Sequence, residues 1–286
     1  MSTKFNTILV PVDFTINTDV AIKRATDLCD GNNATIHLLH VPKMSTASII
    51  SYYQYFARYT RIGPEFDYSK LTTKLEKLKQ KITAIRKDII VSAWVSDGPT
   101  VEMVIAEKAD RLGADLIIIG KNSNHSWVPF LNTVVPSRLS KKTGRPVLTV
   151  KPGSANQDIK MVVVPVDEKF YENKLAIIQE LRKKNRFHIR LIACLNSNDK
   201  KEAASASLVR AFRILKANTV NNVSYEIIRA ENKPRAIAKY CNRVEADLLI
   251  VNPESETRIG WFNTHISDIL PKESRTQVLS VLPASV

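Results

Sequence analysis

Ile8-Leu-Val-Pro-Val-Asp13 returns later in the chain as Val162-Val-Val-Pro-Val-Asp167. Two further motifs return in the same order: Ala114-Asp-Leu-Ile-Ile-Ile-Gly120 as Ala246-Asp-Leu-Leu-Ile-Val-Asn252, and Arg145-Pro-Val-Leu-Thr-Val-Lys-Pro152 as Thr276-Gln-Val-Leu-Ser-Val-Leu-Pro283. An ordered internal repeat predicts two copies of one structural unit. The offset falls from 154 to about 131 residues, so the first copy holds an extra segment of roughly twenty residues.

Short apolar runs alternate with helical patterns in both halves. The expected strands lie near residues 5–12, 35–41, 89–95, 116–120 and 146–150, and near 160–166, 189–195, 223–229, 248–251 and 278–282. The runs are almost continuously apolar, which indicates strands buried on both faces. Strands that alternate with helices imply right-handed crossovers and a parallel sheet. We therefore predict an α/β fold in which each half is a five-stranded parallel sheet flanked by helices.

A short polar stretch at residues 151–157, rich in turn residues, is the natural boundary between the halves. The expected domains are residues 1–152 and 158–286. We expect them to pack as an internal pseudo-dimer that meets at the closing strands, 146–150 and 278–282, without forming one continuous sheet.

The composition excludes a mostly disordered chain, because 44% of the 286 residues are hydrophobic. The net charge is +14; residues 1–151 contribute +8 (21 basic, 13 acidic) and residues 152–286 contribute +6 (21 basic, 15 acidic). A nucleic-acid arm would concentrate such charge. We favour a generally basic surface over a specific nucleic-acid surface, so nucleic acid is not an expected partner.

The cysteines and the hydropathy of the sequence predict the cellular compartment of the protein. Cys29, Cys194 and Cys241 are widely spaced and form no CxxC pair, which is typical of buried thiols in a reducing compartment. The sequence shows no stretch of signal-peptide form and no window with the roughly 20 apolar residues of a membrane span. We therefore expect a cytoplasmic protein without a membrane partner.

The repeated motifs carry a family resemblance. A first strand ending in Val-Pro-Val-Asp13, a second ending in Leu-Leu-His-Val41, the 114–120 strand and the closing 145–150 strand together resemble the universal stress protein superfamily, in two copies. The resemblance implies tandem Rossmann-like domains of the adenine nucleotide alpha hydrolase type. It also implies frequent dimers through the last strand, and ATP binding in some members.

The nucleotide motif of that family is degenerate here. ATP-binding members carry Gly-x-x-Gly, nine residues, then Gly-Ser/Thr after the fourth strand; glycines let the backbone approach phosphates, and the next helix offers free N–H groups. This chain has Gly120-Lys-Asn-Ser123, eight residues, then Asn132-Thr133. The resemblance would place the adenosine moiety against Asp13 and Val41. The candidate residues for ATP or another adenine nucleotide in the first domain are Pro11, Val12, Asp13, Val41, Gly120, Lys121, Ser123, Asn132 and Thr133.

Each candidate also has a structural interpretation. Asp13 could cap a helix or order its loop, Asn132-Thr133 could be a helix N-cap, and Lys121 could be a solvated loop lysine. The second half departs further, with Asn252-Pro-Glu-Ser255 and a single glycine, Gly260, after residue 153. Pro253 removes a backbone donor, and Glu254 and Glu256 add negative charge, so any anion is expected in the first half.

Catalytic and metal constellations are not expected. His37 and His40 lie three residues apart on a predicted strand, so they should point to opposite faces. The residue types of the known hydrolase, phosphate-loop and zinc-protease motifs do not occur at the required spacings. Activity as an enzyme is therefore the minority interpretation, with no catalytic residue and no metal ligand assigned.

The extra segment of the first half is rich in tyrosine and arginine between residues 49 and 61. It could be an amphipathic helix packed on its own domain, a dimer or partner surface, or a base-stacking surface. Two functions compete for the whole chain. The leading hypothesis is a non-enzymatic stress-response protein that acts through interaction, with weak or lost nucleotide binding. The alternative is an adenine-nucleotide binder, with or without slow ATPase activity, that uses the first domain.

Overall fold

The computed structural model describes residues 4–29, 34–42, 68–121, 134–167, 172–195, 201–219, 222–253, 266–271 and 273–282. The strands of the first half are β1 (Thr7–Pro11), β2 (Thr35–His40), β3 (Ile90–Val95), β4 (Leu116–Gly120) and β5 (Val147–Val150). Those of the second half are β6 (Met161–Pro165), β7 (His188–Leu195), β8 (Val223–Arg229), β9 (Leu248–Val251) and β10 (Gln277–Ser280). All ten expected strands are confirmed, with ends that shift by one or two residues.

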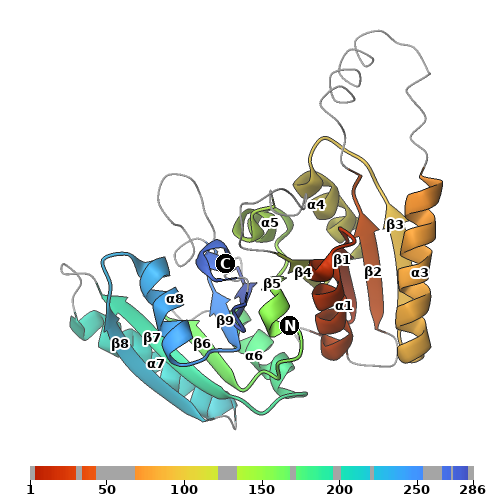
Figure 1. Ribbon diagram of the computed structural model, residues 1–286. Helices are drawn as coiled ribbons and strands as arrows, with labels where there is room; N and C mark the ends of the chain where they lie inside the picture. The colour runs from red at the N-terminus through yellow and green to blue at the C-terminus, as the bar shows by residue number, and fades with distance from the viewer. Residues whose placement is uncertain are drawn as a thin grey trace.

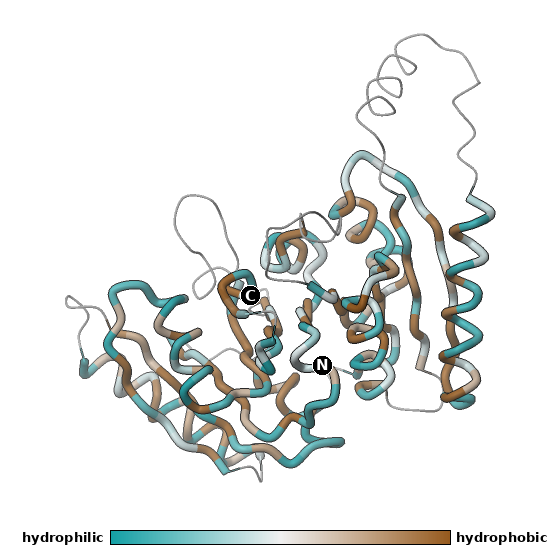
Figure 2. Tube along the Cα trace, in the orientation of Figure 1, coloured by the Kyte–Doolittle hydropathy of each residue, from teal (hydrophilic) through white to brown (hydrophobic). Residues whose placement is uncertain are grey.

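The helices cover both faces of the sheet. One face carries α1 (Ile16–Leu28), α3 (Ser69–Ile85), α6 (Glu172–Arg182) and α7 (Lys201–Asn218). The other carries α4 (Val101–Leu112), α5 (Pro136–Thr143), α8 (Lys233–Arg243) and the single turn α9 (Ile266–Ile269). A short 3₁₀ turn, η2 (Pro152–Ser154), follows β5. Figure 1 shows the two halves as two lobes. Figure 2 shows apolar strands flanked by helices that carry many hydrophilic residues. The α/β fold class is confirmed.

The two halves share one sheet. Its strand order is β3-β2-β1-β4-β5-β10-β9-β6-β7-β8, so each half has the same order, read inward from its own edge. Neighbouring strands are parallel except at the seam, where β5 and β10 pair antiparallel with Leu148 opposite Leu279. The expected meeting of the closing strands is confirmed. The expectation of two separate sheets was wrong, because pairing the closing strands satisfies the backbone donors and acceptors of both.

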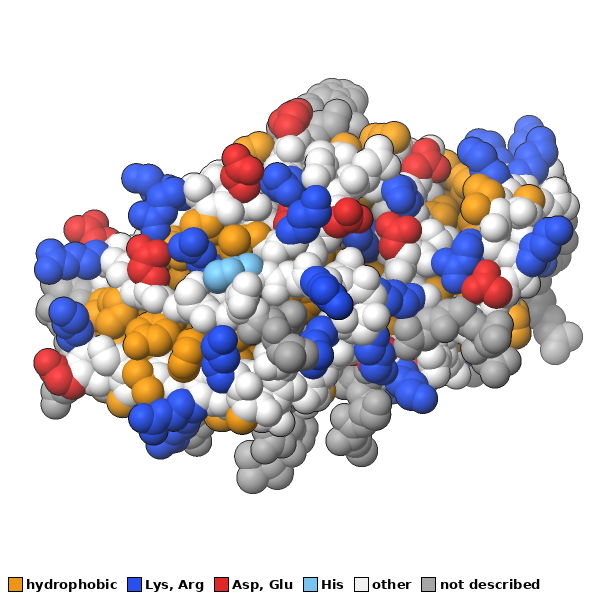
Figure 3. Space-filling model, turned by 90° about the horizontal axis from the view of Figure 1, so that it is seen from below, with side chains coloured by type: hydrophobic (Ala, Val, Ile, Leu, Met, Phe, Trp, Pro, Cys, Tyr) orange, Lys and Arg blue, Asp and Glu red, His pale blue; other side chains and the backbone are white. Residues whose placement is uncertain are grey.

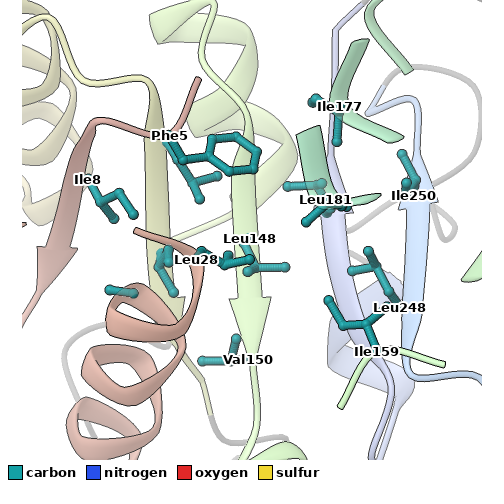
Figure 4. Packing of buried hydrophobic residues seen from close by; sticks show 14 of the residues in the cluster. Phe5, Ile8, Leu28, Leu148, Val150, Ile159, Ile177, Leu181, Leu248 and Ile250 are labelled. Carbon is teal, nitrogen blue, oxygen red and sulfur yellow. The ribbon is translucent and has the colours of Figure 1, made fainter. Parts of the chain in front are cut away.

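One apolar cluster extends through the seam. Phe5, Leu28 and Leu148 of the first half pack in the same cluster as Leu181 and Leu248 of the second half, and all five side chains are buried (Figure 4). They line a cavity of about 10 Å³ whose wall is entirely apolar. A cavity this small and dry holds no ordered water. The halves therefore share a core as well as a sheet.

Two cations on that face tie the halves together. Arg24 of α1 is buried, and it donates to the carbonyl oxygens of Ser154 (3.3 Å) and Gln157 (2.8 Å) in the linker. Lys184, just after α6, donates to the carbonyl oxygens of Asp27 (3.3 Å) and Cys29 at the end of α1. A cation at a helix C-terminus satisfies carbonyls that have no partner within the helix. The second half therefore caps a helix of the first.

Several local expectations can be compared with the structure. Leu71, Leu75, Leu78, Ile82 and Ile85 have the spacing of one apolar helix face, which predicts a helix packed on the sheet. Leu75 and Ile82 of α3 are buried against the sheet, but Ile85 at the end of this stripe is 78% exposed. The cysteines are free thiols; Cys29 and Cys241 are buried and Cys194 is half-buried. Among the helices that the structure describes, none is long and apolar enough to cross a membrane.

Candidate functional site

The turn between β1 and α1 is organised by the carboxylate of Asp13. Its Oδ1 accepts hydrogen bonds from the backbone N of Thr15 (3.0 Å), from Thr15 Oγ1 (2.7 Å) and from Thr18 Oγ1 (2.7 Å). The Asp13 backbone N donates in return to Thr18 Oγ1 (2.9 Å). Thr15 is the N-cap of α1, and its hydroxyl accepts from the N of Asn17. The loop-ordering role of Asp13, one of its two expected interpretations, is thus present.

The second carboxylate oxygen of Asp13 has a different environment. Oδ2 is buried and has no hydrogen-bond partner within the described part of the chain. The same holds for the Oδ1 of Asn17 in the first turn of α1, whose side chain is 3% exposed. Both atoms are acceptors, and a buried acceptor without a donor costs free energy. A ligand with N–H or O–H groups could satisfy them.

Aromatic and basic side chains cover this turn from the α3 side. Phe14 has a left-handed backbone (φ 58°), which is a strained conformation for a bulky residue. Its ring lies 4.7 Å from the ring of His40, and the Nζ of Lys74 lies 5.5 Å from the Phe14 ring centroid. His40 Nδ1 donates to the carbonyl of Val12 (2.7 Å), and burial lowers the pKa of His40. A neutral imidazole therefore fixes the end of β1.

Gly120 ends β4 directly beneath α1. A Cβ built on Gly120 would lie 2.0 Å from the carbonyl oxygen of Asn17, a contact that no side chain tolerates. The glycine is therefore required by the close approach of α1 to the sheet. The close approach of α1 therefore explains Gly120 without any phosphate.

One of the two interpretations of Lys121 was wrong. It is not a solvated loop lysine, because its side chain is 5% exposed. Its Nζ donates to the carbonyl of Val134 (3.1 Å) and forms an ion pair with Asp268 Oδ1 of α9 (2.8 Å). The residue thus joins the end of β4 in the first half to the second half. Its ammonium group would have to leave both partners to reach a phosphate.

The described candidates do come together. Pro11 ends β1 and is followed by Val12 and Asp13, Val41 follows β2, and Gly120 ends β4 and is followed by Lys121. β2, β1 and β4 are neighbours in the sheet. Their carboxyl ends form one edge, which is where open α/β sheets bind ligands. Ser123, Asn132 and Thr133, and the 49–61 segment, lie outside the described residues. His37 and His40 point to opposite faces of the sheet, as expected. The ring of His40 packs against that of Phe14, whereas the pKa of His37 is lowered by burial and by the charge of Lys108 in α4.

The equivalent edge of the second half is built differently. Asp167 Oδ1 lies 3.4 Å from Lys233 Nζ, while its Oδ2 is buried without a partner among the described residues. Lys174 of α6 is 2% exposed and donates to the carbonyl of Pro165 (3.0 Å). A lysine therefore lies beside the aspartate here, where the first half has two threonines.

Titratable groups do not assemble into a metal centre within the described residues, where no three His, Cys, Asp or Glu side chains lie together.

Comparison with protein families matches residues 4–151 to the universal stress protein family. The chain belongs to the universal stress protein family. No curated protein matches the sequence.

Solved structures match over the whole chain. A universal stress protein from Archaeoglobus fulgidus superposes with a TM-score of 0.63 at 17% identity, covering 97% of this chain and 98% of that one. A Pseudomonas aeruginosa structure described as a putative universal stress protein gives 0.58 at 15%, covering 99% and 95%. The cytoplasmic domain of a prokaryotic cation chloride cotransporter gives 0.56 at 12%, covering 98% and 96%. At such identities the likeness shows the fold, and one fold hosts different functions.

Four residues of this edge were missed by the sequence reasoning: Thr15, Asn17, Thr18 and Asp268. Thr15 and Thr18 had a readable signal, because threonines two and five residues after an aspartate at a strand end are typical of an N-terminal helix cap. Asp268 had none. It lies 147 positions after Lys121 in the sequence, and only the seam of the sheet brings it near.

Proposed function

We propose that this member of the universal stress protein family is a non-enzymatic stress-response protein that acts through interaction, with weak or lost nucleotide binding. The observation that carries the proposal is the state of Lys121. The first cation after β4 is buried and held by Asp268 (2.8 Å) and by the Val134 carbonyl (3.1 Å). A phosphate at this edge would have to compete with the carboxylate of Asp268 for the ammonium group of Lys121.

Two further contacts support the same proposal. Asp13 Oδ1 already accepts three hydrogen bonds from Thr15 and Thr18, which exceeds its two lone pairs. The Asn17 carbonyl lies over Gly120 and leaves no room even for a Cβ. The side chain of Ser123, where the family motif has glycine, would narrow the approach of a phosphate.

The competing proposal is an adenine-nucleotide binder, with or without slow ATPase activity, that uses Asp13, Val41, Gly120, Ser123, Asn132 and Thr133 of the first domain. One observation favours it. The Oδ2 of Asp13 and the Oδ1 of Asn17 are buried acceptors without partners in the described residues, and the hydroxyl or amino groups of an adenosine could donate to them. Any such ligand is proposed to bind the first half.

Calorimetric titration of the full chain with ATP, with and without Mg²⁺, separates the two proposals. We expect no binding tighter than about 1 mM, a limit equivalent to roughly 4 kcal/mol. Micromolar binding that Thr133→Ala abolishes and Thr264→Ala preserves would instead establish the competing proposal and its assignment to the first half.

A second titration examines the observation that carries the proposal. Asp268→Asn removes the carboxylate charge that holds Lys121 and leaves the first-half residues intact. If that ion pair is what weakens nucleotide binding, this variant should bind ATP more tightly than the wild type. Glu273→Gln, a change on the same side of the seam that leaves the Lys121 pair in place, is the matched control.

A further inference from the structure

Helix α3 carries an unusual row of charge. Lys70, Lys74, Lys77 and Lys81 are all exposed. Their spacing of four, three and four residues places them on one side of the helix. At 1.5 Å per residue the row is about 16 Å long. Figure 2 shows α3 hydrophilic along most of its length.

The four ammonium groups of this row are not neutralised by any neighbouring acid that the structure describes. Within the described residues none of them pairs with a carboxylate; the single acid of α3, Glu76, pairs with Lys79 (3.1 Å) on another side. In contrast, Arg111 of α4 pairs with Glu107 (2.5 Å), and Arg243 of α8 pairs with Glu226 (2.9 Å). Basic and acidic side chains also lie interspersed over the face in Figure 3.

We infer that this lysine row binds the phosphate backbone of nucleic acid, without reading sequence. Duplex DNA carries about one negative charge per 1.7 Å of its axis, so a 16 Å row faces several phosphates at once. The row itself contains no aromatic side chain on which a base could stack; the ring of Phe14, whose centroid lies 5.5 Å from the Nζ of Lys74, is half-buried in the β1–α1 turn. The row also has no groove-reading arginine fork. Contact is therefore limited to charge.

The neighbours of the row argue against other polyanionic partners. Thr73 and Gln80 are exposed on one side of the row, and on the other side one apolar side chain, Ile85, is exposed at the end of the helix. Helices that lie on anionic membranes present a whole stripe of Trp, Phe or Leu there. Protein interfaces need buried aromatic or arginine anchors, and the row has neither. The counts of charge in each half could not reveal this surface, because paired and unpaired cations count alike.

The test is fluorescence anisotropy of the full chain with a labelled 20-base-pair DNA duplex between 50 and 200 mM KCl. Lys70→Gln/Lys77→Gln/Lys81→Gln removes three charges at exposed positions and keeps helix propensity. We expect the slope of log K against log salt to become shallower by about 2 to 3, at roughly 0.9 per phosphate contact. Binding at 50 mM KCl should weaken about tenfold or more.

The matched control removes three exposed cations from the opposite face of the sheet: Lys142→Gln/Arg235→Gln/Lys239→Gln. It should leave the slope near that of the wild type. Equal losses in both variants would show a generally basic surface and overturn the inference, as would no duplex binding at 50 mM KCl. Preferential binding of phosphatidylserine vesicles or of polyglutamate that depends on the same three lysines would also overturn it.

Discussion

At the scale of single residues, the β1–α1 turn depends on one carboxylate oxygen. Asp13 Oδ1 accepts from Thr15 and Thr18 and so fixes the start of α1. Asp13→Ala should lower the free energy of unfolding by about 2–3 kcal/mol, because hydrogen bonds to a charged acceptor are lost and the threonine hydroxyls are left without it. Urea unfolding followed by circular dichroism measures this. Asp19→Ala, at an exposed position in the first turn of the same helix, should cost about 0.5 kcal/mol. Equal losses in the two variants would contradict the role assigned to Asp13.

His40 makes stability depend on pH at the same edge. Burial lowers the pKa of His40 below its ordinary value of 6.5, so the folded protein disfavours the proton that the unfolded chain accepts. The free energy of unfolding should therefore fall as the pH falls below about 6.5. His40→Asn preserves an N–H for the Val12 carbonyl but does not titrate, so its stability should decline less between pH 7 and 5. An unchanged decline would assign the effect to His37 and His188, whose pKa values burial also lowers.

Residue roles at this edge were only partly predictable. That Asp13 orders its loop could be read from the threonines that follow it. The burial of Lys121 could not, because a lysine after a strand is ordinarily solvated and only the ion pair with Asp268 compensates its desolvation.

At the scale of elements, the contact of α1 with β4 depends on Gly120. Gly120→Ala should destabilise the protein by about 3 kcal/mol or more, because the new Cβ meets a helix backbone oxygen at 2.0 Å. Gly113, at the end of α4, is the matched control: its backbone is left-handed (φ 59°) with open space around it, so alanine costs only about 1 kcal/mol. Thermal unfolding of the two variants compares them, and similar melting temperatures would exclude the steric explanation.

Element positions were largely readable from the sequence, because the strands inside the sheet are mostly buried on both faces and leave continuous apolar runs; the outer strands β3 and β8 are partly exposed. β4, β8 and β9 have the expected bounds. The end of the apolar stripe on α3 was less readable: Ile85 has the spacing of a packed residue, but it is the last residue of the helix and is exposed.

At the scale of the whole molecule, Lys151 is buried across the seam. It follows β5, and its Nζ donates to the Leu270 carbonyl after α9 (2.5 Å). Burial lowers the pKa of Lys151 from 10.5 to about 8. Between these values the unfolded chain binds a proton that the folded protein releases, so the free energy of unfolding should rise with pH.

Lys151→Met removes that titration. Across pH 8 to 10.5 the wild type should gain about 1–3 kcal/mol of stability relative to this variant, at 1.36 kcal/mol per pKa unit. Urea unfolding at several pH values gives the difference. The exposed Lys142→Met should follow the wild type, and a parallel pH course for all three proteins would show that Lys151 does not titrate with folding.

The contact between the two halves was the feature least predictable from the sequence. The repeat indicated two like units and the resemblance indicated their closing strands as the contact, and β5 does pair with β10. That this contact completes a single sheet and core could not be inferred, since it depends on distant residues such as Leu28 and Leu181 packing in one cluster. The domains 1–152 and 158–286 remain a prediction, to be examined by expressing the two fragments separately and together.

The seam has a consequence for assembly. Because β5 and β10 pair with each other, the outermost strands of the described sheet are β3 and β8, at opposite ends. A copy that docked its β3 on the β8 of the next would present the same pair of outer strands again and would grow into an open ribbon, whereas β3 on β3, or β8 on β8, about a two-fold axis would close a dimer. A finite oligomer of this protein that is built by strand addition must therefore pair like strands.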